Sequence, residues 1–178
     1  TYYDETLGRA VSKFVPAENL VVPYETSDLE TCPNITQVVR MSLNDLRKRQ
    51  INGTYLDVEV LPAQKEMSDL DGELDRIEGM EPNQIDYDCT ILECHVDLDL
   101  EGYEDLDDDG EPTGIKIPYV VTISEDNGQV LSIRRNYREE DELRKKIQYF
   151  THFKFLPGFG VYGFGLIHTI GGLSRTAT

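Results

Sequence analysis

Two strand-length segments joined by a tight-turn sequence constrain the fold of this chain most strongly. Residues 115–124 and 129–135 are rich in β-branched residues, and Asp126, Asn127 and Gly128 lie between them. An Asn-Gly pair supplies the positive φ angles that a tight hairpin turn requires. The two segments therefore predict neighbouring antiparallel strands.

The remaining segments predict further strands and short helices. Residues 35–41 and 89–100 have extended or alternating patterns, and Ser42 followed by Asp45 predicts a capped helix that ends before Asn52 and Gly53. We also expect extended edge segments at 14–16 and 20–24, strands at 55–61 and 149–156, and helices at 63–80, 138–147 and 164–170, the last interrupted at residues 171–172. The expected fold class is α+β, mainly an antiparallel β-sheet with two to four short helices.

We expect three segments that together form one compact domain. Residues 1–61 form a mixed extended and helical segment, residues 62–111 an acidic helix and acidic turn, and residues 112–178 antiparallel strands that end in a glycine-aromatic turn and the start of a helix. A chain of 178 residues is long enough to bury a core of its own.

The negative charge of the chain is concentrated in one segment. The formal net charge is −17, and residues 66–111 contain 19 acidic residues and one basic residue, which gives −18. The other residues together carry +1. The acidic segment is therefore unsuited to gripping nucleic-acid phosphates, whereas the rest of the chain is nearly neutral.

Processing and redox signals are few. The three cysteines, Cys32, Cys89 and Cys94, are an odd number and are expected to be reduced thiols. The sequences Asn34-Ile35-Thr36 and Asn52-Gly53-Thr54 match the glycosylation pattern, and we interpret both as turn chemistry. There is no signal-peptide pattern, no apolar run approaches the roughly 18 residues of a membrane span, and the absence of an initiator Met suggests an excised fragment.

Asp105, Asp107, Asp109 and Gly110 match the first part of a calcium-binding loop. Position 12 of such a loop should be a bidentate Glu, but here it is Lys116. We therefore expect a solvated turn between strands and keep the three aspartates as weak metal-ligand candidates.

Gly158, Gly160 and Gly163 have the spacing of a dinucleotide-binding turn. Such a site also needs an acidic residue about 20 positions later, and no acidic residue follows Gly163. The run instead predicts a sharp chain reversal with close backbone approach and packed aromatic rings.

Basic residues are dense between positions 134 and 154, but acidic residues interrupt them. This pattern favours a surface with many salt bridges over a surface that binds phosphate groups. The three histidines, His95, His152 and His168, fall in separate segments, and no nucleophile-base pattern accompanies them. We therefore expect no enzymatic activity and no cofactor.

Three segments resemble the portal proteins of short-tailed bacteriophages and related prophages. They are residues 4–24, residues 131–137 (LSIRRNY) and residues 149–168 (YFTHFKFLPGFGVYGFGLIH). The acidic segment 66–111 carries no matching signature.

The resemblance implies a structural rather than a catalytic role. Portal proteins form rings, usually dodecamers, at one capsid vertex, and double-stranded DNA passes through the channel without sequence-specific binding. The chain would be an internal fragment from the wing region, and it would occur in the virion and, during assembly, in the bacterial host cytoplasm. Expected partners are other copies of the chain, terminase, tail adaptor proteins and capsid proteins, with no membrane.

Within this interpretation, Arg134, Arg135, Phe159 and Tyr162 are the candidate interface residues. The alternative from a different class is a small acidic domain that binds a divalent metal or another ligand through the turn from Asp105 to Glu111.

Overall fold

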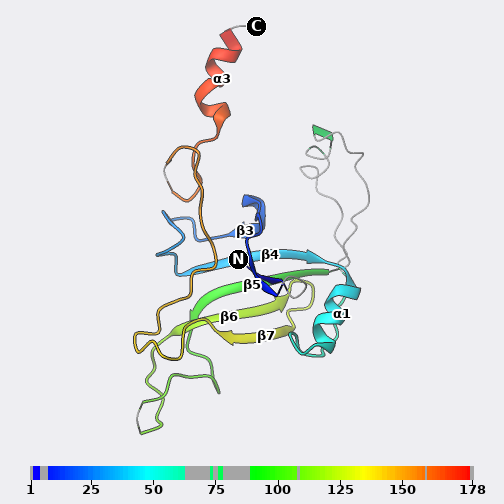
Figure 1. The fold of residues 1–178 in the computed structure, drawn as a ribbon, viewed down its shortest axis with the longest axis vertical. Coiled ribbons are helices and arrows are strands. Elements are labelled where there is room, and N and C mark those ends of the chain that lie inside the picture. Colours follow the sequence, from blue (N-terminus) through cyan, green and yellow to red (C-terminus); the bar gives the residue numbers. More distant parts are fainter. Residues whose placement is uncertain are drawn as a thin grey trace. The chain divides into compact units, whose positions relative to one another are not determined.

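The computed structural model describes residues 2–4, 8–62, 73, 76–77, 89–107, 109–158 and 160–176. Its main feature is a five-stranded antiparallel sheet with strand order β3-β4-β5-β6-β7 (Figure 1). This sheet and the few short helices that accompany it confirm the predicted α+β class. The sheet strands are β3 (Leu20–Val21), β4 (Asn34–Met41), β5 (Cys89–Leu98), β6 (Ile117–Ser124) and β7 (Val130–Arg135), and the helices are α1 (Leu43–Ile51) and α3 (Leu166–Thr176).

The N-terminal part forms a separate small hairpin. Strands β1 (Tyr2–Asp4) and β2 (Arg9–Val11) pair antiparallel, with Tyr2 opposite Val11. A short 3-10 helix, η1 (Ala17–Asn19), leads into β3, which lies at one edge of the five-stranded sheet. That edge position is the one predicted for the proline-bounded segment 20–24.

The chain divides into two compact units. Unit 1 comprises Thr1–Thr36, His95–Tyr119 and Arg135–Thr178, and unit 2 comprises Gln37–Cys94 and Val120–Arg134. Each unit has a hydrophobic cluster of its own. The cluster of unit 1 consists of Leu29, Cys32, Ile35 and Val161, and that of unit 2 of Met41, Leu46, Tyr55, Cys89, Ile91 and Leu131.

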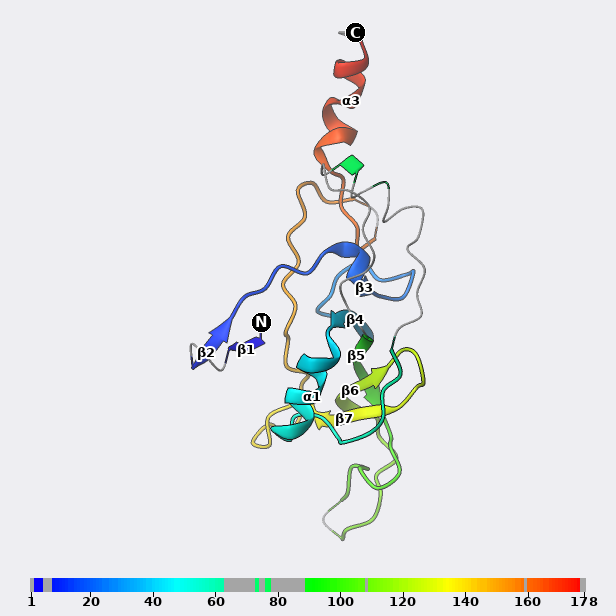
Figure 2. The ribbon, with the colours of Figure 1, turned by 90° about the vertical axis from the view of Figure 1, so that its right-hand side faces the viewer.

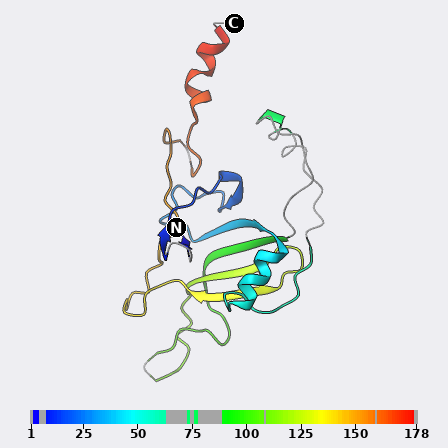
Figure 3. The ribbon, with the colours of Figure 1, turned by 45° about the vertical axis from the view of Figure 1, so that its right-hand side comes forward.

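Helix α1 follows β4 directly because Ser42 turns the chain and caps the helix. The backbone of Ser42 is extended, and its Oγ accepts a hydrogen bond from the Asp45 backbone N–H at 3.1 Å. The helix ends at Ile51 with Asn52 as its C-cap, after which Gly53 adopts a φ of 78°. Figures 2 and 3 show α1 beside the strands, and its Leu46 belongs to the unit 2 cluster. The predicted cap and helix are confirmed.

The hairpin between β6 and β7 is also confirmed. The Ser124 N–H donates to the Gln129 carbonyl at 2.9 Å, and the Gly128 N–H donates to the Ser124 carbonyl at 2.9 Å. Only Gly128 of the Asn-Gly pair takes a positive φ, at 67°. The turn therefore depends on glycine at that position.

Two predicted strands do not form: Gln50 takes two backbone carbonyls of the first, and Gln148 donates to the Phe150 carbonyl of the second at 2.9 Å. In residues 55–61, the Leu56 N–H donates to the Leu131 carbonyl, but Gln50 binds the carbonyls of Leu56 and Val58. Residues 149–156 form a single bridge, from Leu156 to Phe164.

The predicted helix at 138–147 is wrong as well. The Asp141 carboxylate accepts hydrogen bonds from the backbone N–H groups of Leu143 and Lys145, so a local turn replaces the helix. Arg144 there adopts a left-handed φ of 48°.

At the C-terminal side, α3 runs through Gly171 and Gly172 instead of being interrupted by them. The predicted helix at 63–80 lies largely outside the described residues, of which Glu73, Arg76 and Ile77 are helical.

Removing the α1 cap should destabilise unit 2. We expect Ser42→Ala to lower the free energy of unfolding by about 1 kcal/mol, because the Asp45 N–H loses its acceptor. Ser42→Asp, which keeps an acceptor at the same position, should stay close to the original chain. Urea unfolding followed by circular dichroism measures both values, and equal losses in the two variants would show that the cap does not stabilise the helix.

Candidate functional site

The acidic turn between β5 and β6 is a hairpin-like loop whose tip is organised by Asp107. Leu106 and Pro112 form an antiparallel bridge. The Asp107 carboxylate accepts hydrogen bonds from the backbone N–H groups of Asp109, at 3.0 Å, and Glu111, at 2.9 Å. This carboxylate therefore stabilises the turn itself.

Asp105 lies at the base of the same loop and is buried, with 5% of its surface exposed. One carboxylate oxygen lies 2.6 Å from a guanidinium nitrogen of Arg144, and the other accepts a hydrogen bond from the Thr113 hydroxyl at 2.8 Å. A buried carboxylate needs such partners, because removing its charge from water is costly. Asp105 thus joins the loop to residue 144 within unit 1.

These contacts engage both carboxylate oxygens of Asp105 and one carboxylate oxygen of Asp107. Over the described ranges, which omit Asp108, no group of three or more His, Cys, Asp or Glu residues is placed to hold a metal ion. Asp107 is exposed, whereas the predicted solvation does not extend to Asp105, which is buried. Sequence spacing could not reveal the pairing with Arg144, which is 39 positions away.

The glycine run reverses the chain as predicted. The Phe164 N–H donates to the Leu156 carbonyl at 2.9 Å. A β-carbon on Gly163 would lie 2.5 Å from that carbonyl oxygen, so only glycine fits there. Gly160 has a φ of 80°. The strand that a dinucleotide motif requires before its glycines does not form, and the aromatic side chains of Tyr162 and Phe164 are exposed rather than packed inside.

One stretch of unit 1 exposes many large apolar side chains. We name it the apolar segment, residues 149–170. Its exposed large hydrophobic residues are Tyr149, Phe153, Phe155, Leu156, Tyr162, Phe164, Leu166 and Ile170. Single exposed apolar residues are ordinary, but so many within 22 positions are typical of an interaction surface.

Lys154 holds the apolar segment against the body of unit 1. Its ammonium group donates to the Ser27 carbonyl at 3.0 Å and to the Gly160 carbonyl at 3.1 Å. Neighbouring residues of extended backbone point to opposite sides. Consequently Phe153 and Phe155 face solvent, with 89% and 65% of their surfaces exposed. The predicted alternation of residues 149–156 contained this signal, although we interpreted it as a strand.

The candidate interface residues lie in different parts of the fold. Arg134 belongs to unit 2 and lies 3.9 Å from a Glu93 carboxylate oxygen, whereas Arg135 belongs to unit 1, where its charge acts on the Tyr119 hydroxyl. Burial raises the pKa of Tyr119, and the charge of Arg135 acts in the opposite direction. Tyr162 is exposed in the apolar segment, and Phe159 lies outside the described residues.

The histidines have separate surroundings. The buried His95 ring packs against Tyr149 and Phe150, with ring centroids 5.4 and 5.0 Å apart. His168 accepts a hydrogen bond from the Gly165 N–H at the start of α3. Partial burial and the nearby charge of Lys154 lower the pKa of His152. None of these contacts joins a histidine to a nucleophilic hydroxyl or thiol.

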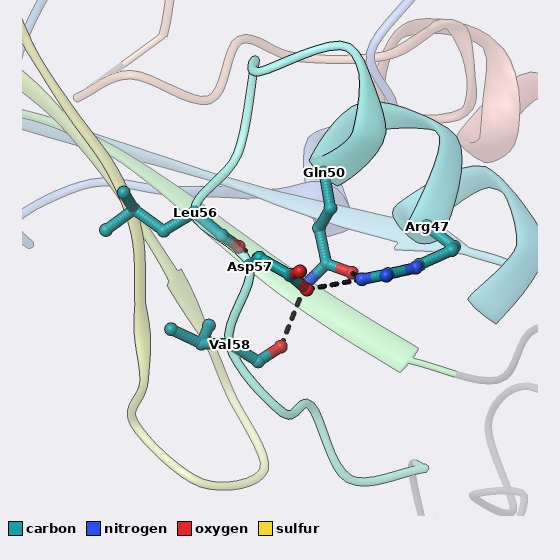
Figure 4. Close-up of polar contacts among 5 residues, drawn as sticks. All are labelled: Arg47, Gln50, Leu56, Asp57 and Val58. Carbon is teal, nitrogen blue, oxygen red and sulfur yellow. Dashed lines mark hydrogen bonds and ion pairs between the residues drawn. The ribbon is translucent and has the colours of Figure 1, made fainter.

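Unit 2 contains a groove of about 480 Å³ between α1 and residues 57–60. Leu43, Leu46, Val58 and Val60 supply its apolar lining. Figure 4 shows Gln50 reaching from the helix to the neighbouring segment, where its amide donates to the Leu56 and Val58 carbonyls at 3.2 and 2.8 Å. Arg47 forms an ion pair with Asp57 on the same side. Because both charges are exposed, this pair contributes about 0–1 kcal/mol.

Comparison of the chain with protein-family models, with curated proteins and with solved structures finds no match. Among the described residues, no helix has both the length and the apolar character needed to cross a membrane.

Arg144 should be important for the stability of unit 1. We expect Arg144→Ala to lower the free energy of unfolding by about 1–3 kcal/mol, because the buried Asp105 carboxylate loses its charged partner. Arg144→Gly loses the same partner but relieves the left-handed backbone, so it should be about 1 kcal/mol more stable than Arg144→Ala. Chemical unfolding of both variants checks the order, and two curves that coincide with that of the original chain would contradict it.

Proposed function

We propose that the chain is a non-catalytic structural module from the wing region of a phage portal ring. Genomic DNA is packaged and ejected through such a ring. The observation that carries this proposal is the exposed apolar segment, residues 149–170. The same residues contain one of the three stretches that resemble portal proteins, YFTHFKFLPGFGVYGFGLIH at 149–168.

The physical basis is the cost of leaving this surface in water. Burying apolar area is favourable by about 25 cal/mol per Å², and aromatic residues dominate the energetics of many protein interfaces. The Lys154 contacts fix the backbone between Phe153 and Phe155. A surface that is already held in place loses less conformational entropy when a partner binds.

Neighbouring copies of the chain are the partners that best fit a ring. In a cyclic assembly each copy uses two different surfaces, one for each neighbour. Terminase, tail adaptor proteins and capsid proteins are further partners of such a ring, and the virion and the bacterial host cytoplasm are its expected locations. The acidic residues of the loop between β5 and β6 would repel DNA from this part of the chain.

Replacing the outward aromatic residues should weaken self-association. We expect the chain to associate weakly at high concentration, and we expect Phe153→Ser combined with Phe155→Ser to raise the dissociation constant at least about tenfold, because aromatic hot spots contribute more than about 1 kcal/mol each. Sedimentation velocity over a concentration series measures this change.

Leu143→Ser provides the matched control. Leu143 also lies in unit 1 and is 74% exposed, but it is outside the apolar segment. Its replacement should leave association unchanged. If the double variant associates as tightly as the original chain, the apolar segment is not the contact surface.

A further inference from the structure

Two Asn-Gly pairs occur in described turns and differ in how the asparagine side chain is held. Asn52-Gly53 follows α1, and Asn127-Gly128 lies in the β6-β7 turn. An asparagine followed by glycine is open to an intramolecular reaction, because glycine has no β-carbon to obstruct approach of its backbone nitrogen to the asparagine side-chain carbonyl carbon.

The amide of Asn127 is fixed at both ends. Its Nδ2 donates to the Glu59 carbonyl at 2.9 Å, and its Oδ1 accepts from the Gln129 N–H at 3.2 Å. The Gly128 nitrogen is also engaged, since it donates to the Ser124 carbonyl at 2.9 Å. Both reacting groups of this pair are therefore held in hydrogen bonds on the hairpin.

The side chain of Asn52 is held by one end. Its Oδ1 accepts from the Thr54 N–H at 3.0 Å, and within the described part of the chain no hydrogen bond restrains its Nδ2. Asn52 is exposed, and the Gly53 N–H makes a 3.1 Å bond to the Gln50 carbonyl in the last turn of α1. Helix ends fray, and we expect this nitrogen to be released more often than that of Gly128, whose asparagine side chain is held at both ends.

We propose that Asn52 is a site of spontaneous deamidation in the folded protein, whereas Asn127 is protected. After base removes its proton, the Gly53 backbone nitrogen forms a bond to Cγ of Asn52. The side-chain amide leaves as ammonia, which gives a succinimide ring. Water then opens the ring at either carbonyl, and the product at position 52 is aspartate or isoaspartate, with one added negative charge.

The modification would affect the junction between α1 and the unit 2 cluster. The N–H groups of Thr54 and Tyr55 donate to the Arg49 carbonyl at 2.9 and 3.0 Å, directly after the modified bond. Tyr55 is buried in the cluster, and its hydroxyl accepts a hydrogen bond from Arg49 at 3.0 Å. An isoaspartate adds a methylene group to the main chain at position 52, which would displace these two amides from their acceptor.

Peptide mapping by mass spectrometry tests the proposal. The intact chain is incubated at mildly alkaline pH, and the roughly one-dalton gain is quantified separately at positions 52 and 127. We expect deamidation of Asn52 to be about tenfold faster than that of Asn127, because the two turns differ in their local opening. The same incubation in guanidinium chloride is the control, since both pairs should then react at similar rates.

Faster reaction at Asn127 than at Asn52, or no measurable reaction at Asn52 in the folded chain, would overturn the proposal. A rate ratio that stays the same in guanidinium chloride would also overturn it, because the difference would then come from local sequence rather than from the fold.

Discussion

Burial of Leu46, Ile91 and Leu131 in one cluster is the interaction on which the organisation of unit 2 depends. These residues come from α1, β5 and β7, which are far apart in the sequence. Each fully buried aliphatic side chain stabilises the fold by about 1.5–3 kcal/mol, far more than the exposed Arg47–Asp57 pair. Once α1 lies on the cluster, Gln50 can reach the carbonyls of Leu56 and Val58 and hold the segment that follows.

Unit 1 is organised differently. Its described cluster has four buried residues, and long cationic side chains add polar contacts. Lys146 donates a hydrogen bond to the Cys32 carbonyl at 2.6 Å, and Lys154 donates one to the Ser27 carbonyl. Arg144 forms an ion pair with the buried Asp105. Several aromatic residues that could have enlarged the cluster face solvent instead. Polar contacts inside unit 1 combined with exposed apolar side chains are expected of a chain that buries further surface against a partner.

Local signals in the sequence predicted the elements whose stability is local. The Ser42 cap and the Asn-Gly turn need only neighbouring residues, and both were predicted. The predictions for residues 55–61, 138–147 and 149–156 are wrong because side chains bind the backbone there. Gln50 takes two backbone carbonyls, Asp141 takes two backbone N–H groups, and Gln148 donates to the Phe150 carbonyl. Of the candidate site, the chain reversal was predictable from glycine spacing, and the alternation of residues 149–156 predicted that Phe153 and Phe155 share one side. The Asp105–Arg144 pair and the exposure of that side to solvent required the tertiary structure.

Electron microscopy of the full-length protein tests the central claim most directly. The proposed portal role predicts closed rings with a central channel in negatively stained samples under packaging-like conditions. Full-length protein that remains monomeric under all such conditions would contradict that role.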